Sequence, residues 1–145
     1  MLSAILTYVK IKKSIFTPSI SVVYVDDSDD EYQELSKMFK MHGYAFIANS
    51  VIFFDVVNLK KDGWFKKEYL QFIESHEIAH KVLKHRDGPR SKRQEGEADF
   101  LGIRLCQDKG LDLAANVGIK HFADRNSIAF DVYQKKYGKK VLNSV

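Results

Sequence analysis

Residues 69–83 read YLQFIESHEIAHKVL and contain the pattern His-x-x-x-His with a glutamate after the first histidine. Apolar residues and both histidines recur at the spacing of one helix face: Tyr69, Phe72, Ile73, His76, Ala79, His80 and Leu83. Three polar side chains fall on the opposite side of the same helical projection: Glu74, Lys81 and His85. We therefore predict a helix over about residues 65–85 with one buried face that carries both histidines.

The two histidines indicate a metal site. His76 and His80 are four residues apart, so both imidazoles project from one helix face and can bind one ion. A buried imidazole without a polar partner is costly, and a metal would satisfy both rings. Glu77 lies about 100° further round the helix, at the edge of that face, where it can take a proton from a metal-activated water. The alternative is a pair of core histidines that bond to backbone carbonyls.

A third ligand is available in residues 94–99, which read QEGEAD. Catalytic zinc is normally held by three protein ligands. Five residues define the inward face of a helix over about residues 93–108: Ala98, Leu101, Gly102, Leu105 and Cys106. Glu95 and Asp99 share this face, so we predict Glu95 as a ligand and Asp99 as the acceptor of a hydrogen bond from a liganding histidine. Glu97 points away, and we expect it to be exposed and paired with Arg93.

With these residues in view, the chain resembles the gluzincin metallopeptidases. Within them it is most similar to the branch with the CAAX prenyl endopeptidases, the heat-shock membrane proteases and the small soluble minigluzincins. That branch often reads H-E-I-A-H with a further histidine five residues on, matched here by His85. An E-x-E-A-D-x-x-G stretch follows in the family, and residues 95–102 match it. The similarity spans about residues 44–122 and implies a zincin-like α+β fold.

The resemblance also implies an activity. A gluzincin is a zinc-dependent endopeptidase, so one zinc ion would be held by both histidines and Glu95, with Glu77 as general base. The substrate would be a peptide or protein. Gluzincins stabilise the oxyanion with a downstream tyrosine or histidine, and the candidates here are His121, Tyr133 and Tyr137. We choose His121 because it follows the helix that matches the family.

The chain departs from the large members of the branch in two ways. No apolar run reaches the roughly 20 residues that a membrane span needs, so we expect no membrane partner. The connection between the second histidine and the third ligand, positions 81–94, is fourteen residues long and leaves no room for an inserted subdomain. A compact minigluzincin-like core fits these features.

The remaining elements predict a single α+β domain over residues 1–145. Residues 1–19 form an N-terminal segment with a short amphipathic helix over its first nine residues, residues 20–64 are mainly sheet, and residues 65–145 are mainly helical. The expected strands cover residues 20–25, 44–48 and 51–57, and the last two form a hairpin around Asn49 and Ser50. This hairpin is similar to the family's hairpin with its active-site edge strand, so a peptide substrate would add beside residues 51–57.

The other expected elements are helices. They cover residues 30–41, 112–123 and 127–137, in addition to the two already described, and Gly43 and Gly138 are expected to end the first and the last.

Composition is compatible with a soluble, intracellular domain. The chain has 145 residues, 45% hydrophobic and 29% charged, with one cysteine and a formal net charge of +4. We expect no disulfide and, without a signal peptide, a cytoplasmic location. Basic residues gather at positions 81–93 and 135–140. The ordinary interpretation is a solvated surface, and a basic rim that attracts acidic substrates or nucleic acid is the weaker one.

Three alternatives to a simple endopeptidase stay open. The chain could belong to another H-E-x-x-H family that cleaves repressors or DNA-bound proteins. It could be a zinc-stabilised binding module without turnover, although a structural site has no use for Glu77 and prefers four protein ligands. It could also be a latent enzyme, with a terminal segment of the chain in the cleft.

Overall fold

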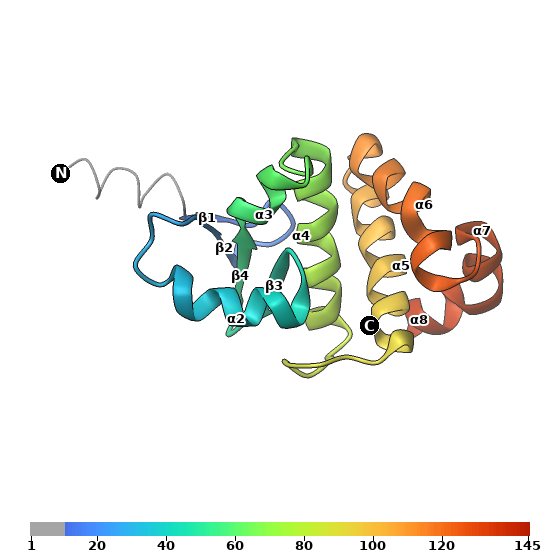
Figure 1. The fold of residues 1–145 in the computed structure, drawn as a ribbon. Coiled ribbons are helices and arrows are strands. Elements are labelled where there is room, and N and C mark those ends of the chain that lie inside the picture. Colours follow the sequence, from blue (N-terminus) through green and yellow to red (C-terminus); the bar gives the residue numbers. More distant parts are fainter. Residues whose placement is uncertain (1–10) are drawn as a thin grey trace. The chain divides into compact units, whose positions relative to one another are not determined.

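The computed structural model describes residues 11–145, which divide into two compact units, the first ending at Phe65 and the second covering Lys66–Val145. The first unit contains the sheet, and the second is helical (Figure 1). All the described strands precede residue 65, and the content confirms the α+β class. The helix predicted over the first nine residues lies outside the described residues.

The first unit is built around a four-stranded mixed sheet in the order β1-β2-β4-β3. Its elements are β1 (Ile11–Lys13), β2 (Ser21–Val25), α2 (Tyr32–His42), β3 (Ala45–Ala48), β4 (Val51–Asp55) and α3 (Val56–Lys61). β1 is antiparallel to β2, β2 is parallel to β4, and β3 is antiparallel to β4. The sequence predicted no strand in the N-terminal segment, so β1 corrects that part of the prediction.

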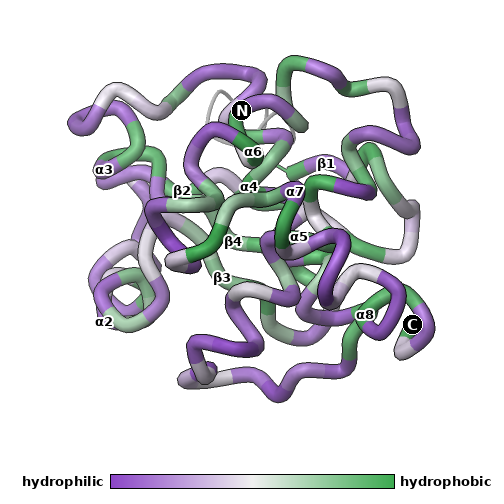
Figure 2. The backbone as a smooth tube through the Cα atoms, turned by 90° about the vertical axis from the view of Figure 1, so that its right-hand side faces the viewer, coloured by the Kyte–Doolittle hydropathy of each residue, from purple (hydrophilic) through white to green (hydrophobic). Residues whose placement is uncertain are grey.

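Strand β4 occupies the interior of the sheet, which corrects its predicted place at an active-site edge. β2 pairs with one side of β4 and β3 with the other, so no backbone groups of β4 are left for a peptide. Ile52 and Phe54 have no exposed surface, and β4 is hydrophobic along most of its length (Figure 2). Such a continuous apolar run is typical of a central strand. A peptide that extended this sheet would have to pair with β1 or β3.

The predicted hairpin is confirmed, with a different end to its second strand. Asn49 and Ser50 both have positive φ, 51° and 63°, as the two central residues of a tight hairpin turn require. β4 ends at Asp55, whereas we predicted a strand through residue 57. The Asp55 carboxylate accepts a hydrogen bond from the Asn58 backbone N–H at 3.2 Å and so begins the short helix α3.

Helix α2 packs on the sheet through Phe39, whose ring lies 5.2 Å from that of Phe46. Both side chains belong to a buried cluster with Val25. Gly43, with φ of 99°, follows the helix and ends it as predicted.

The second unit consists of helices α4 (Lys67–Val82), α5 (Lys92–Asp108), α6 (Asp112–Asn126), α7 (Phe130–Tyr133), the π-helical turn η1 (Gln134–Gly138) and α8 (Lys139–Asn143). α4, α5 and α6 lie side by side, each antiparallel to the next (Figure 1). Gly118 of α6 allows close packing, because a Cβ there would lie 2.5 Å from Phe72 and 2.6 Å from Ile103.

The C-terminal segment continues through the glycine that was expected to end it. α7, η1 and α8 follow one another without a break, and Gly138 is buried inside the run. A Cβ at this position would lie 3.0 Å from the ring of Phe100. Gly138 therefore serves close packing on α5 rather than termination, which corrects the prediction.

Within residues 11–145, no helix combines the length and hydropathy that a membrane-spanning helix requires.

Candidate metal centre

The candidate site lies between α4 and α5, whose backbones approach closely. Gly102 of α5 faces His76: a Cβ on the glycine would lie 3.1 Å from both the Cα and the backbone N of His76. Because the helices are antiparallel, the residues before Gly102 on α5 face the residues after His76 on α4. This arrangement brings Glu95 and Asp99 to the two histidines.

Three potential ligands converge, as the sequence predicted. The Nε2 atoms of His76 and His80 are 3.2 Å apart. Glu95 Oε1 lies 2.7 Å from His80 Nε2, and Glu95 Oε2 lies 3.6 Å from His76 Nε2. One ligand atom from each residue fits within a mutual distance of 4.8 Å. His80 is buried, whereas the Glu95 side chain is 49% exposed, so the cluster is open to solvent on the side of the carboxylate.

Asp99 lies against His76, one of the two histidines that it was predicted to orient. Its Oδ1 lies 2.8 Å from Nδ1 of His76. The carboxylate is held from α6 by Arg125, which donates to both oxygens at 3.1 and 2.5 Å, and by the Asn126 amide at 3.0 Å. An ionised Asp99 places the proton of His76 on Nδ1 and leaves the Nε2 lone pair directed at His80 and Glu95.

His80 is oriented by a chain of polar contacts that the sequence did not predict. Its Nδ1 lies 2.9 Å from Nδ1 of His85, and Nε2 of His85 lies 3.2 Å from Glu97 Oε1. The other oxygen of Glu97 accepts from Arg93 at 3.0 Å. Because the Glu97 carboxylate accepts from His85 Nε2, His85 Nδ1 is the acceptor of the His80 Nδ1 proton. The Nε2 lone pair of His80 therefore also points into the cluster.

The end of α4 explains why His85 was placed on the wrong side. The helix ends at Val82, and Lys84 has a positive φ of 60°. The backbone N–H of His85 donates to the carbonyl of His80 at 2.9 Å, the long bond of a Schellman turn. This turn folds His85 back over His80. Glu97, expected to be exposed, is partly buried by the same contact, while its predicted pairing with Arg93 is confirmed.

The electrostatics of the cluster favour a bound cation. Burial alone would lower the pKa of His76, but the charge of Asp99 raises it to about 10. Burial lowers the pKa of His80 to about 4. Burial of Glu95 opposes ionisation, but its contacts with both histidines hold its pKa far below the ordinary value. With no other cation, the site binds a proton on His76, because two converging lone pairs and a carboxylate require positive charge between them.

Glu77 lies beside this cation site. It is buried, and its Oε2 is 3.9 Å from His76 Nε2. Its Oε1 is buried and has no hydrogen-bond partner within residues 11–145. Burial raises the pKa of Glu77 to about 7, against the opposing charges of His76 and Arg90. A carboxylate with this pKa and one open oxygen is suited to accept a proton near neutral pH.

The donor set fits zinc. Two nitrogen ligands of a tetrahedral zinc ion are about 3.3 Å apart, from Zn–N bonds of about 2.0–2.1 Å. The two Nε2 atoms here are 3.2 Å apart. Two imidazoles and a carboxylate are ligands that zinc accepts, and the Nδ1 atom of each histidine lies within 3 Å of a polar side-chain atom, as is usual for liganding histidines.

The three residues considered for oxyanion stabilisation lie on α6 and on the run from α7 to η1. The ring of His121 on α6 lies 6.4 Å from that of Tyr69, which precedes His76 by seven residues or about 10 Å along α4. Tyr133 and Tyr137 pack against each other, with ring centroids 5.0 Å apart, beyond the other side of α5. The role of His121 stays a prediction.

No protein-family model, no curated protein and no solved structure matches this chain.

Proposed function

We propose that this chain is a zinc-dependent endopeptidase with a gluzincin-like site. The observation that carries the proposal is the convergence of His76, His80 and Glu95 beside Glu77, a buried carboxylate with one open oxygen. A purely structural site would have no use for such a base. The proposal includes a zincin-like fold and a peptide or protein substrate.

Five residues of the chain would bind the ion or orient its ligands. His76, His80 and Glu95 hold the ion, and Asp99 and His85 keep the imidazoles in the orientation that the ion requires. Zinc, when bound, would polarise the scissile carbonyl and lower the pKa of the attacking water.

Glu77 moves the proton. Its Oε1 accepts a proton from the attacking water while the water oxygen bonds to the carbonyl carbon. The protonated carboxyl then donates that proton to the amide nitrogen as the C–N bond breaks, which leaves a carboxylic acid and an amine. A pKa of about 7 suits both steps, since the group must take up and release a proton at one pH.

Arg90 is a second candidate, beside His121, for stabilising the oxyanion. Its Nε and Nη2 are buried and have no hydrogen-bond partner within residues 11–145. Its charge acts on Glu77 and His80, which places it near the cluster. Unpaired buried donors of a guanidinium are suited to receive developing negative charge. Replacing Arg90 or His121 by Ala would show which one lowers kcat by the roughly 100-fold or more expected of such a donor.

The deciding experiment compares Glu77→Gln with the native protein and with Glu68→Gln, which removes the same charge from the first turn of α4. Cleavage of a mixed peptide library is followed by mass spectrometry, and zinc content by elemental analysis. We expect Glu77→Gln to keep zinc and lose cleavage, and Glu68→Gln to keep both. Native protein that binds zinc without cleaving any peptide, or equal cleavage by Glu77→Gln, would overturn the proposal.

A further inference from the structure

A cavity lies on the side of α5 that faces away from the metal cluster. It has a volume of about 480 Å³, is open to solvent, and is lined by the first turns of α5, the end of α6 and the run from α7 to α8. This is within the range of about 300–1,000 Å³ typical of small-molecule sites. The peptidase proposed above makes no use of it.

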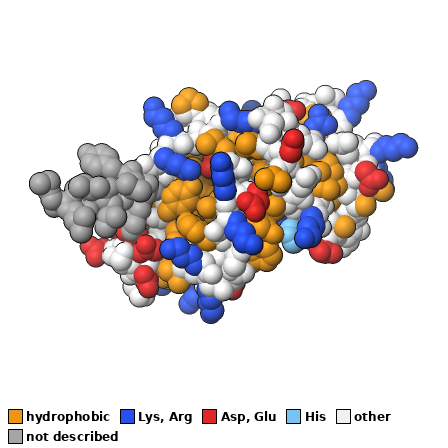
Figure 3. All heavy atoms as spheres, turned by 90° about the horizontal axis from the view of Figure 1, so that it is seen from above, with side chains coloured by type: hydrophobic (Ala, Val, Ile, Leu, Met, Phe, Trp, Pro, Cys, Tyr) orange, Lys and Arg blue, Asp and Glu red, His pale blue; other side chains and the backbone are white. Residues whose placement is uncertain are grey.

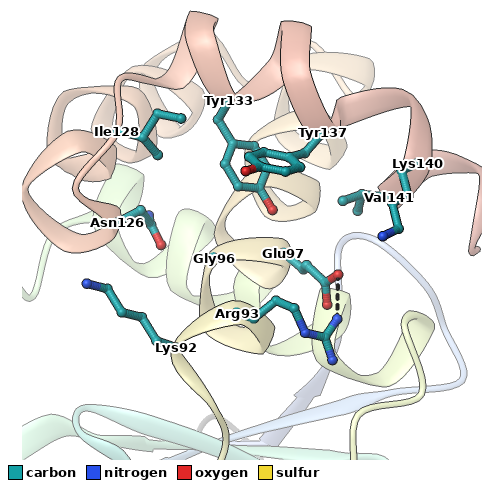
Figure 4. Close-up of a pocket in the computed structure, with 10 residues that line it drawn as sticks. All are labelled: Lys92, Arg93, Gly96, Glu97, Asn126, Ile128, Tyr133, Tyr137, Lys140 and Val141. Carbon is teal, nitrogen blue, oxygen red and sulfur yellow. Dashed lines mark hydrogen bonds and ion pairs between the residues drawn. The ribbon is translucent and has the colours of Figure 1, made fainter.

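One wall of the cavity is aromatic and apolar. The rings of Tyr133 and Tyr137 lie together above Gly96 and Glu97, with Ile128 on one side and Val141 on the other (Figure 4). Gly96 lets the Asn126 amide approach the floor of the cavity, because a Cβ there would lie 2.9 Å from Asn126 Oδ1. A flat ring would find stacking partners and apolar contact here.

The rim of the cavity is cationic. Lys92, Arg93 and Lys140 line it, and Glu97 is its one acid among the described lining residues. Glu97 is already paired with Arg93 and His85. Within residues 11–145, the Lys92 ammonium donates only to the Ser127 hydroxyl, at 3.4 Å, and Lys140 has no carboxylate partner. The N-terminal end of α5 adds partial positive charge to this rim.

We propose that this cavity binds a small aromatic anion and that its occupancy is transmitted to the metal cluster through Glu97. The ring would lie against the two tyrosines, and the anionic group would lie between Lys92, Arg93 and Lys140. The binding itself does not depend on the function proposed above, whereas the transmission rests on the metal site.

The transmission follows from the contacts of Glu97. An anion that engages Arg93 withdraws positive charge from Glu97, which becomes a stronger acceptor for the proton on His85 Nε2. His85 Nδ1 then accepts more strongly from His80, and the Nε2 lone pair of His80 becomes more basic. Stronger outer hydrogen bonds of this kind raise metal affinity. The bound anion should therefore tighten zinc binding, and zinc should tighten anion binding by the same factor.

The binding test uses benzenesulfonate as the probe, since sulfonates coordinate zinc weakly. The metal-free full chain is titrated and followed by two-dimensional NMR of the backbone amides. We expect saturable shifts centred on Gly96, Glu97 and Asn126, and at least tenfold weaker binding in Lys140→Glu. Lys135→Glu is the matched control, because this exposed lysine lies on the same run and does not line the cavity.

Several outcomes would overturn the binding. Shifts elsewhere on the protein, or equal loss in Lys140→Glu and Lys135→Glu, would refute the site. Equal affinity for sulfate would refute the aromatic wall, and equal affinity for benzyl alcohol would refute the cationic rim.

The transmission test measures zinc affinity by competition with a chelator, with and without saturating benzenesulfonate. We expect a severalfold increase in the native protein and none in Glu97→Gln, whose melting temperature checks that it folds. An unchanged or decreased affinity would refute the transmission. If the native protein binds no zinc at all, the metal site and the transmission both fail, and the NMR titration alone decides whether the cavity is a ligand site.

Discussion

The two sides of the first turns of α5 have opposite electrostatic character. On the side of α4, Glu95 faces the Nε2 lone pairs of both histidines, and Asp99 holds the Nδ1 proton of His76, so the site favours a cation. On the side of α7 and α8, Lys92 and Lys140 have no carboxylate partner within residues 11–145. One short stretch of helix can thus serve two ligands of opposite charge, because successive residues point about 100° apart.

The two sides also differ in how firmly their polar groups are held. Each histidine ligand contacts an outer partner within 3 Å, so the cluster is organised before any ion binds. Lys92 on the other side has a single long contact, 3.4 Å to Ser127, and Figure 3 shows basic side chains spread over one face of the protein. The cation side should therefore respond strongly to single substitutions, and the anion side weakly. Four predictions test this difference.

Loss of a ligand should have the largest effect. His80→Ala removes one of the two imidazole ligands, so zinc affinity should fall by more than the roughly 10–100-fold that outer partners contribute. His42→Ala, on α2, is the control and should bind zinc normally. Competition with a chromophoric chelator measures both. Zinc affinity within tenfold of native in His80→Ala would show that the three side chains are not the binding site.

Asp99→Asn should have the second-largest effect on zinc affinity. The amide cannot hold the proton of His76 as the carboxylate does, and Arg125 loses its ion pair. We expect zinc affinity to fall roughly 10–100-fold. Asp124→Asn, an exposed aspartate of α6, is the control. Equal zinc binding by Asp99→Asn and the native protein would mean that Asp99 only packs the helices together.

Zinc affinity should rise about tenfold per pH unit between about pH 8 and 9.5, because each ion must displace the proton of His76. The metal-free pKa of His76, raised to about 10 by Asp99, sets the upper limit of this range. At lower pH, protons compete more strongly with zinc for His76, so zinc affinity falls as pH falls. Calorimetry in buffers of different ionisation enthalpy should count close to one proton released per zinc. Release of no proton at pH 8 would contradict the assignment of a protonated His76.

Ser91→Ala should have the smallest effect. The Ser91 hydroxyl accepts from Gln94 N–H at 3.1 Å, and the Gln94 side chain accepts from Ser91 N–H at 3.0 Å. Loss of this capping box should lower the free energy of unfolding by about 1 kcal/mol. Because α5 begins at this capping box, the loss of stability should affect the metal cluster and the cavity alike. Chemical denaturation measures the change, and Ser144→Ala at the chain end is the control.

The sequence predicted the parts that depend on local geometry. The spacing of His76, His80, Glu95 and Asp99 follows from regular helix periodicity, so four residues of the site could be placed before the structure was known. The hairpin and most helix ranges are set by equally local signals, such as the Asn49–Ser50 turn.

The errors arose where structure is not local or not regular. β4 was placed at an edge because its parallel pairing with β2 joins residues 30 positions apart, such as Ser21 and Val51. The unbroken apolar run of β4 was the signal in the sequence that it is a central strand. His85 was projected as if α4 continued, although the helix had ended, and its match to the family motif was the hint that it belongs to the site. Arg125 and Asn126 left no signal, because only the packing of α6 brings them to Asp99.

The Schellman turn at the end of α4 has a consequence for how the site is assembled. It lets the proposed ligands, the proposed base and their outer partners Asp99, His85 and Glu97 come from one contiguous stretch, residues 76–99. Contacts so near in sequence close only short loops and can form early in folding. If the proposed zinc ion binds during synthesis, it would link α4 to α5 before α6 has been synthesised. The same compactness makes the hairpin a unit that could be transplanted into another pair of antiparallel helices.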